Sequence, residues 1–134
     1  MWPPEVETIA APLRAAGIEA RLEELAPGET DFPGAAADAV AYECPDGLVI
    51  ALVPVDREVD TRKVAAAAGC APSGRVASPP FPFENAARVV LEQRLLAERI
   101  VWLQAGSERF VLGLEPGVLR HLTRAVAADL TQNG

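Results

Sequence analysis

The residues that could support metal binding or nucleophilic catalysis are few and scattered. Cys44 and Cys70 lie far apart without a C-x-x-C motif, and His121 is the only histidine. A tetrahedral zinc site needs about four such ligands. Cys44 has acidic neighbours, which oppose the thiolate that a nucleophile requires. His121 has no carboxylate close in sequence, which favours a packing or surface role. The sequence therefore predicts two reduced thiols, no metal and no cofactor.

Charged residues also follow a long apolar run. Asp56 and Arg57 come directly after it, where they either face a pocket or form a solvated turn. Asp60 stands where the N-cap of the next helix is expected, and this capping role needs no further function.

The stretch around these charged residues carries a family resemblance. Residues 52–65, LVPVDREVDTRKVA, resemble the hallmark segment of the YbaK/ProX family, bacterial aminoacyl-tRNA editing domains found free or attached to prolyl-tRNA synthetase. The likeness continues upstream at residues 15–18 and Thr30, and downstream at residues 90–96, 101–106 and 114–116. The pieces occur in the family's order over nearly the whole chain.

The resemblance implies a fold, a reaction and partners. The implied fold is α/β, with a mixed sheet curled around a small pocket and surrounded by helices. The pocket would receive the aminoacyl ester at the 3′ end of a mischarged tRNA and hydrolyse it, and a synthetase is a further implied partner. Backbone amides of a glycine-containing loop would polarise the carbonyl while a ribose hydroxyl assists the water. This chemistry rests on oxyanion stabilisation and proximity, so it needs no Ser-His-Asp triad.

One departure from the family bears directly on activity. The family has a lysine just before the strand that is predicted at residues 40–44, and the matching position here is Asp38, within one residue. The only lysine, Lys63, lies on a later helix, and no arginine lies between Arg21 and Arg57. A carboxylate repels a phosphate or a carbonyl dipole where an ammonium attracts it.

Three hypotheses about function therefore remain. The first is a stand-alone deacylase with weak or altered activity, and the second is a non-catalytic binding or interaction module on the same scaffold. The third is an unrelated α/β domain that binds a small molecule in a pocket outside the matched positions.

The resemblance also implies the site residues. Those at catalytic positions are Asp38, Gly74, Pro79 and Gly106, and those expected to contact substrate are Thr30, Tyr42, Asp56 and Ser78. Residues 74–79 form either a degenerate version of the family's G-x-x-x-P substrate loop or a strand and the segment that follows it. Tyr42 either lines the pocket or packs in the core. The run Phe81-Pro82-Phe83 is either a lid or a plug that fills space.

Composition limits the number of domains and the classes of partner. A chain of 134 residues, half of them hydrophobic, is expected to form a single domain over residues 1–134. Its net charge of −7 argues against broad affinity for phosphate, so any nucleic-acid contact must be local or supplied by a partner. The longest apolar run, residues 48–54, is too short to cross a bilayer, and the first residues lack a signal-peptide pattern. We therefore expect no membrane association and a cytoplasmic location.

Periodicity predicts the elements that position these residues. The first half of the chain is predicted to hold a helix over residues 4–16 that Pro12 disturbs and Gly17 ends, a strand over 18–23, a loop over 26–34 and a short helix from Ala35. Strands 40–44 and 48–53 are predicted to form a hairpin through the Pro45-Asp46-Gly47 turn, followed by a helix over 61–68. In the second half we expect a rigid loop over 74–83 and strands over 88–91, 100–105 and 109–114. A closing helix is expected to carry one apolar stripe, formed by Val118, Leu119, Leu122, Val126 and Leu130.

Overall fold

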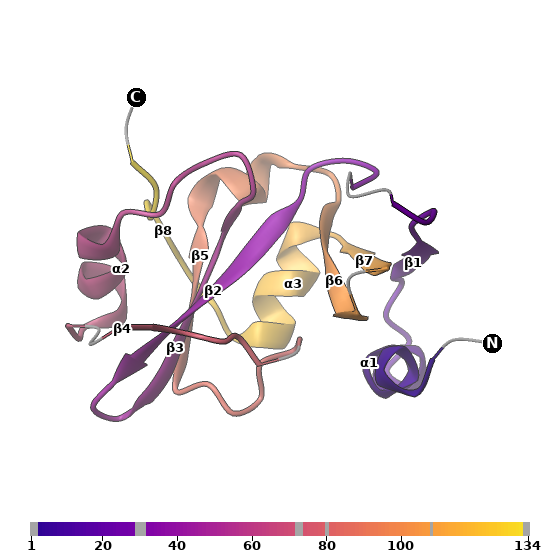
Figure 1. The fold of residues 1–134 in the computed structure, drawn as a ribbon, viewed down its shortest axis with the longest axis horizontal. Helices are drawn as coiled ribbons and strands as arrows, with labels where there is room; N and C mark the ends of the chain where they lie inside the picture. The colour runs from indigo at the N-terminus through magenta and orange to yellow at the C-terminus, as the bar shows by residue number, and fades with distance from the viewer. Residues whose placement is uncertain (1–2, 29–31, 72–73, 80, 108, 133–134) are drawn as a thin grey trace.

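The computed structural model describes residues 3–28, 32–71, 74–79, 81–107 and 109–132 (Figure 1). The chain contains both strands and helices, so the fold is mixed α/β. In chain order the elements are α1 (Pro4–Ala15), β1 (Arg21–Glu24), β2 (Ala37–Cys44), β3 (Gly47–Pro54), α2 (Thr61–Ala68), β4 (Gly74–Val76), β5 (Arg88–Glu92), the short 3-10 helix η1 (Gln93–Ala97), β6 (Val101–Ser107), β7 (Phe110–Leu114), α3 (Pro116–Thr123) and β8 (Val126–Ala128).

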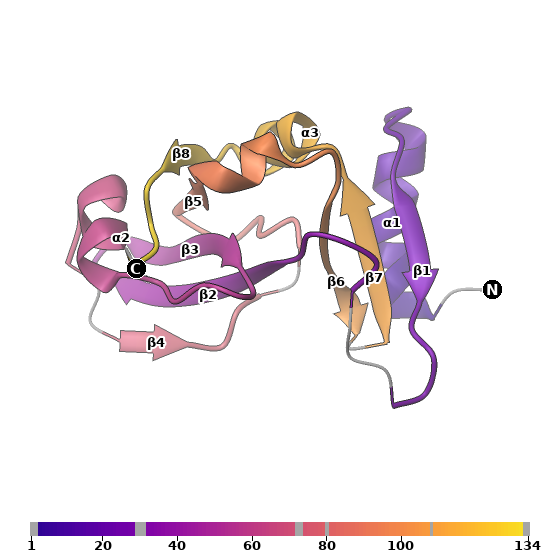
Figure 2. The ribbon, with the colours of Figure 1, turned by 90° about the horizontal axis from the view of Figure 1, so that it is seen from above.

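The strands form two sheets that stand side by side in Figure 2. The five-stranded sheet has the order β4-β2-β3-β5-β8, with antiparallel pairs on one side of β3 and parallel pairs on the other. The three-stranded sheet has the order β1-β7-β6 and is antiparallel throughout. A parallel bridge between Ala36 and Trp102 links the start of β2 to β6. The predicted mixed sheet is therefore present, accompanied by a second sheet.

Strand β3 lies at the centre of the five-stranded sheet and is covered on both faces, as its uniformly apolar sequence predicts. Because successive side chains alternate, Ile50 and Leu52 join a core cluster with α1 and both sheets. Val49 and Ala51 face the other way and pack in a second cluster with Val64 of α2. The hairpin thus separates the two cores.

Helix α2 has the boundaries that its capping residues predict. The Asp60 carboxylate accepts a hydrogen bond from the amide of Arg62 at 3.0 Å, and Gly69 ends the helix with φ 75°. Helix α1 also begins where expected and accommodates Pro12 near its end. Its apolar positions at helical spacing, Val6 and Ile9 among them, are buried.

Two local predictions are wrong. The segment from Ala35 forms no helix; it enters β2, whose first residue pairs with the last of β3. The closing helix stops at Thr123, and Arg124 caps it in a left-handed conformation with φ 56°. The chain then extends as β8, which pairs in parallel with β5. In both cases pairing along an available sheet edge outweighs the helical propensity of alanine-rich sequence.

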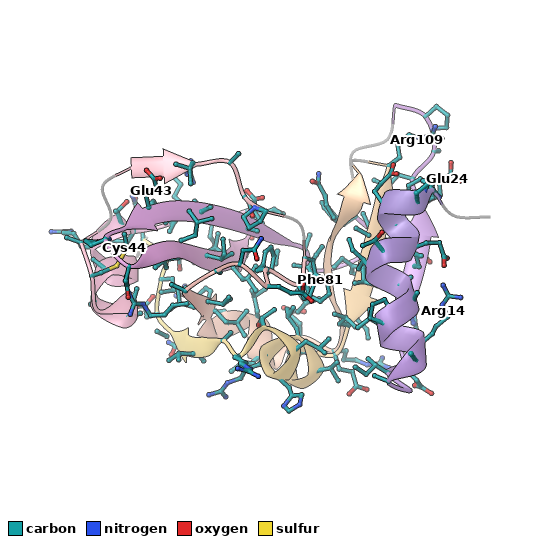
Figure 3. All side chains as sticks on the ribbon, turned by 90° about the horizontal axis from the view of Figure 1, so that it is seen from below. Arg14, Glu24, Glu43, Cys44, Phe81 and Arg109 are labelled. Carbon is teal, nitrogen blue, oxygen red and sulfur yellow. A yellow bond between two sulfur atoms is a disulfide. The ribbon has the colours of Figure 1, made fainter. Side chains whose placement is uncertain are left out.

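The prediction of two reduced thiols is also wrong. Cys44 and Cys70 form a disulfide bond, with their Cα atoms 6.4 Å apart, which joins the end of β2 to the segment after α2 (Figure 3). The hairpin and the α2 connection bring the two residues together although 26 positions separate them in the chain. Such a proximity depends on tertiary packing and leaves no local signal in the sequence.

The C-terminal segment is held by a buried carboxylate. Glu92, at the end of β5, is fully buried and accepts hydrogen bonds from the amides of Arg94 and Leu130 and from the Thr131 hydroxyl, at 2.7, 2.9 and 3.3 Å. Nearby, the Lys63 ammonium donates to Asp129 and to the Thr131 carbonyl, both at 2.8 Å. Lys63, the only lysine, thus serves to anchor the C-terminal segment.

None of the helices in the described parts of the chain has the length and apolar character that crossing a membrane requires.

Candidate functional site

A cavity of about 840 Å³ lies where α1, the start of β2, β6 and the segment 78–83 meet. Its volume suits a small ligand or the end of a larger one. Large apolar side chains form most of its wall: Ile9, Phe32, Val55, Phe81, Phe83 and Leu103. Polar side chains also line it, namely Glu5, Thr8, Asp38, Ser78 and Gln104. We call this hollow the Asp38 cavity.

Each element contributes residues by its own periodicity. Glu5, Thr8 and Ile9 stand three and four positions apart on α1, so they share one face of the helix. Asp38 lies near the start of β2, opposite Val53 in the hairpin register. It is exposed, whereas the residues before it are buried. The alternation of β2 therefore directs the Asp38 carboxylate away from the core.

The aromatic residues of the loop after β4 form the inner wall of the cavity. Phe81 and Phe83 are buried in the larger core cluster, with ring centroids 5.8 Å apart in an edge-to-face arrangement. Phe83 has φ 63°, a left-handed conformation that non-glycine residues seldom adopt, and its buried ring compensates. Figure 3 shows Phe81 between the two sheets. Of the two roles expected for this run, the structure shows the space-filling one.

The polar groups of the cavity fall into two kinds. The hydroxyls of Thr8 and Ser78 donate to the carbonyls of Pro4 and Pro79, at 2.9 and 3.0 Å, so their protons are engaged. By contrast, no hydrogen bond or ion pair joins the side chains of Glu5, Asp38 or Gln104 to another described residue. These last groups are available to a ligand.

The charge of the cavity is negative. Its two ionisable residues are the carboxylates Glu5 and Asp38, and no lysine, arginine or histidine stands among its described lining residues. A ligand with an ammonium group and an apolar body would find complementary partners here. The Gln104 carboxamide is the neutral group able to donate to a carbonyl oxygen.

The structure brings together three of the residues expected at the site. Asp38, Ser78 and Pro79 all line the cavity. Gly74 lies apart as the first residue of β4, opposite Glu43, and Gly106 lies in β6, two positions after the lining residue Gln104.

Two of the other expected substrate contacts, Tyr42 and Asp56, lie elsewhere. Tyr42 is buried in the smaller core cluster beneath α2, which is the packing alternative for this residue. Asp56 is exposed and lines a separate hollow of about 370 Å³ that also touches Arg57 and Arg94. Thr30 lies outside the described residues.

Three polar lining residues, Glu5, Thr8 and Gln104, were not expected from the sequence. Glu5 reads as an ordinary acidic residue in the first turn of a helix, where it favours the helix dipole. Gln104 interrupts the apolar sequence of β6. A single polar residue within an apolar run is the one sequence signal that could have marked Gln104 as a site residue. Among the described residues, no group of three or more His, Cys, Asp or Glu side chains is placed to hold a metal ion.

Comparison with known proteins supports the fold. No protein-family model and no curated protein sequence matches the chain significantly. Among solved structures, it is similar to one described as "a putative trans-editing enzyme for prolyl tRNA synthetase", with TM-score 0.85 and 18% identity over 99% of this chain and 100% of that one.

Two further structures give the same result. A protein from work on epitope backbone grafting by computational design has TM-score 0.84 and 20% identity, covering 98% of this chain and 100% of its own. The hypothetical protein APE2540 has TM-score 0.76 and 17% identity, covering 92% of this chain and 98% of its own. At these identities the likeness establishes a shared fold, which matches the editing-domain architecture expected from the sequence.

Proposed function

We propose that this protein binds the aminoacyl group at the 3′ end of a mischarged tRNA in the Asp38 cavity and acts on it as a slow trans-editing deacylase. The observation that carries the proposal is the cavity itself. It opens beside the β2–β3 hairpin, between α1 and the segment 78–83, and Asp38, Ser78 and Pro79 line it. The fold shared with the structure described as a trans-editing enzyme supports the same reading. Such a substrate also implies a cytoplasmic location and contact with a synthetase.

The lining groups suit the parts of an aminoacyl ester. Its apolar side chain would pack against Ile9, Phe81 and Leu103, and its α-ammonium would pair with Asp38 or Glu5. The Gln104 carboxamide would donate to the ester carbonyl as negative charge develops on it. A water molecule adds to that carbonyl, the bond to the ribose oxygen breaks, and the ribose oxygen takes up the proton that the water loses.

The missing cation predicts a low rate. In the family that the sequence resembles, a lysine at the Asp38 position helps to hold the substrate. Here the described lining residues supply no positive charge, and two carboxylates would repel the developing oxyanion. This observation also favours the second candidate function, a binding module that holds the aminoacyl group without hydrolysing it.

The test is a deacylation assay with purified protein and a panel of mischarged tRNAs, including Ala- and Cys-tRNA. We expect slow hydrolysis or none from the natural protein. At saturating substrate we expect hydrolysis by the Asp38→Lys variant to be faster by about tenfold or more, although its KM should rise because the substrate ammonium loses a counter-charge. One charge-assisted contact is worth about 1.5–3 kcal/mol, which corresponds to that range. Glu19→Lys is the matched control, because Glu19 is exposed, lies outside the cavity and undergoes the same change of charge.

The outcomes separate the two functions. Faster hydrolysis by Asp38→Lys but not by Glu19→Lys supports a deacylase weakened by the loss of its lysine. Binding of a non-hydrolysable aminoacyl-adenosine analogue without hydrolysis by either variant supports the binding module. Rapid hydrolysis by the natural protein contradicts the binding module, and failure to bind the analogue contradicts both.

A further inference from the structure

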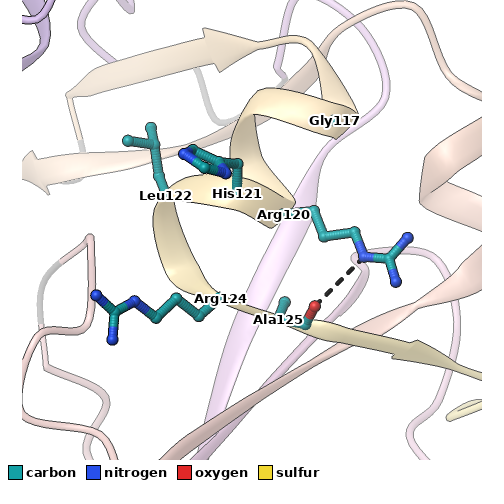
Figure 4. A pocket seen from close by; sticks show the side chains of 6 residues that line it. All are labelled: Gly117, Arg120, His121, Leu122, Arg124 and Ala125. Atoms are coloured by element: carbon teal, nitrogen blue, oxygen red, sulfur yellow. Dashed lines mark hydrogen bonds between the residues drawn. The ribbon is translucent and has the colours of Figure 1, made fainter.

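Positive charge is concentrated at the end of α3, away from the acidic cavity. A hollow of about 620 Å³ there is lined by Arg120, His121 and Arg124 together with Gly117, Leu122 and Ala125 (Figure 4). No carboxylate stands among the described residues that line it. We call Arg120, His121 and Arg124 the α3 basic surface. In a chain of net charge −7, such a surface is the local site that binding to a polyanion would require.

The arginines of this surface are not neutralised by described carboxylates. Six of the twelve lysine and arginine side chains do lie within 4.0 Å of a carboxylate oxygen, and all six are elsewhere in the chain: Arg14, Arg62, Lys63, Arg88, Arg94 and Arg109. Arg120 makes a hydrogen bond from Nε to the Ala125 carbonyl at 3.4 Å, and Arg124 makes none from its side chain to a described residue. Since a guanidinium carries five N–H donors, most of the donors on this surface face solvent.

The two guanidinium groups point to opposite sides of the helix end (Figure 4). In this arrangement they cannot grip one phosphate together, but they can contact separate phosphates of a chain. A hydrogen bond to the segment just after α3 accounts for Arg120, whose Nε donates to the Ala125 carbonyl. It does not account for Arg124, which caps the helix and directs its guanidinium away from it.

A third hollow shares lining residues with both the α3 basic surface and the Asp38 cavity. Leu122 and Arg124 also line a neighbouring hollow of about 490 Å³, which extends to Pro82 and Phe83. Phe83 in turn lines the Asp38 cavity. The α3 basic surface and the cavity are therefore connected through the lining of this third hollow, with the buried Phe83 common to it and the cavity.

We propose that the α3 basic surface binds the phosphate backbone of RNA. The part of this inference that leads the RNA 3′ end to the Asp38 cavity rests on the proposed function. The binding of the backbone does not, because it depends only on the charge and placement of Arg120 and Arg124.

The test measures the affinity of the full chain for an acceptor-stem RNA hairpin with a single-stranded 3′ end that carries no amino acid. Fluorescence anisotropy is recorded between about 50 and 200 mM salt, a range over which phosphate contacts make the affinity depend steeply on salt concentration. For Arg120→Gln/Arg124→Gln we expect about tenfold weaker binding and a slope of log affinity against log salt that is smaller by about 2.

A matched control removes the same charge elsewhere. Arg21 and Arg62 are exposed on β1 and α2, at opposite ends of the molecule in Figure 1, and Arg21→Gln/Arg62→Gln should bind almost as the natural protein does. Because Arg120 also contacts Ala125, the single variant Arg124→Gln is measured as well, with circular dichroism to confirm folding. We expect it to show about a threefold loss.

Three outcomes would overturn the inference. They are no RNA binding at low salt, equal losses in the two double variants, and displacement of the RNA by inorganic phosphate at matched ionic strength, which indicates a single-anion site. The Ala39→Phe variant fills the Asp38 cavity and should retain RNA binding. RNA binding by the natural protein together with failure to bind the aminoacyl-adenosine analogue would contradict the proposed function alone.

Discussion

Two carboxylates on neighbouring parts of the five-stranded sheet have opposite surroundings. Glu92, at the end of β5, is fully buried, and its two oxygens accept three hydrogen bonds from residues that follow it in the chain. Asp38, near the start of β2, is exposed in a cavity and has no described partner. One carboxylate holds the fold together, and the other is left for a ligand.

This difference shows how to separate structural from functional acidic residues. A buried charge is tolerated only when donors replace the water it has lost, and Glu92 meets that condition through the amides of Arg94 and Leu130. An exposed carboxylate keeps its water and contributes little to stability. If it also lies among apolar walls, as Asp38 does, a ligand can gain from displacing that water.

The largest effect on stability is expected from Glu92→Ala. Removing the carboxylate leaves the Leu130 amide without its acceptor and releases the Thr131 hydroxyl, so the free energy of unfolding should fall by about 2–4 kcal/mol. Urea denaturation followed by circular dichroism measures this. Glu98→Ala, at an exposed position near the end of η1, is the control and should change it by less than about 0.5 kcal/mol. Similar losses in both variants would contradict a structural role for Glu92.

A smaller, pH-dependent effect is expected at Asp129. The hydrogen bond from Lys63 holds the pKa of the Asp129 carboxyl below its ordinary value of 3.8. Because the folded pKa is the lower one, the stabilisation is fully present above pH 3.8 and is lost as the pH falls through the folded pKa. The difference in unfolding free energy between the natural protein and Asp129→Asn should therefore be largest near neutral pH and shrink below pH 3.8.

Denaturation at a series of pH values measures this difference. Asp46→Asn is a control, because Asp46 forms an exposed ion pair with Arg88 at 2.8 Å, and exposed ion pairs contribute little to stability. A gap between the natural protein and Asp129→Asn that stays constant down to pH 2 would exclude the Lys63–Asp129 pair as its source.

The smallest effect on stability is expected from Asp38→Ala. With no described partner to lose, the variant should unfold within about 0.5 kcal/mol of the natural protein, or be slightly more stable as repulsion from Glu5 is relieved. The same variant should bind an aminoacyl-adenosine analogue more weakly by about tenfold, because the ammonium of the ligand loses its counter-charge. A clear loss of stability with unchanged binding would show that Asp38 has a structural role and does not bind the ligand.

The local elements were largely readable from the sequence. The boundaries of α2 follow from Asp60 as a cap and Gly69 as a stop, and the β2–β3 hairpin follows from its Pro-Asp-Gly turn. The same local signals failed at Ala35 and after Thr123, where strand pairing replaced the expected helices. Caps and turns act within a few residues and are written in sequence, whereas a sheet edge is offered by residues far away in the chain.

The candidate site divides in the same way. The sequence by itself determined that the Asp38 position is acidic, that little cationic charge lies near it in the chain, and that any binding to nucleic acid must be local. Only the tertiary structure decided that Glu5 of α1 and Gln104 of β6 join Asp38 in one cavity, that Tyr42 packs in a core, and that Cys44 bonds to Cys70. The physical reason is that residue chemistry belongs to each side chain alone, but proximity across elements depends on how two sheets and three helices bury their apolar faces together.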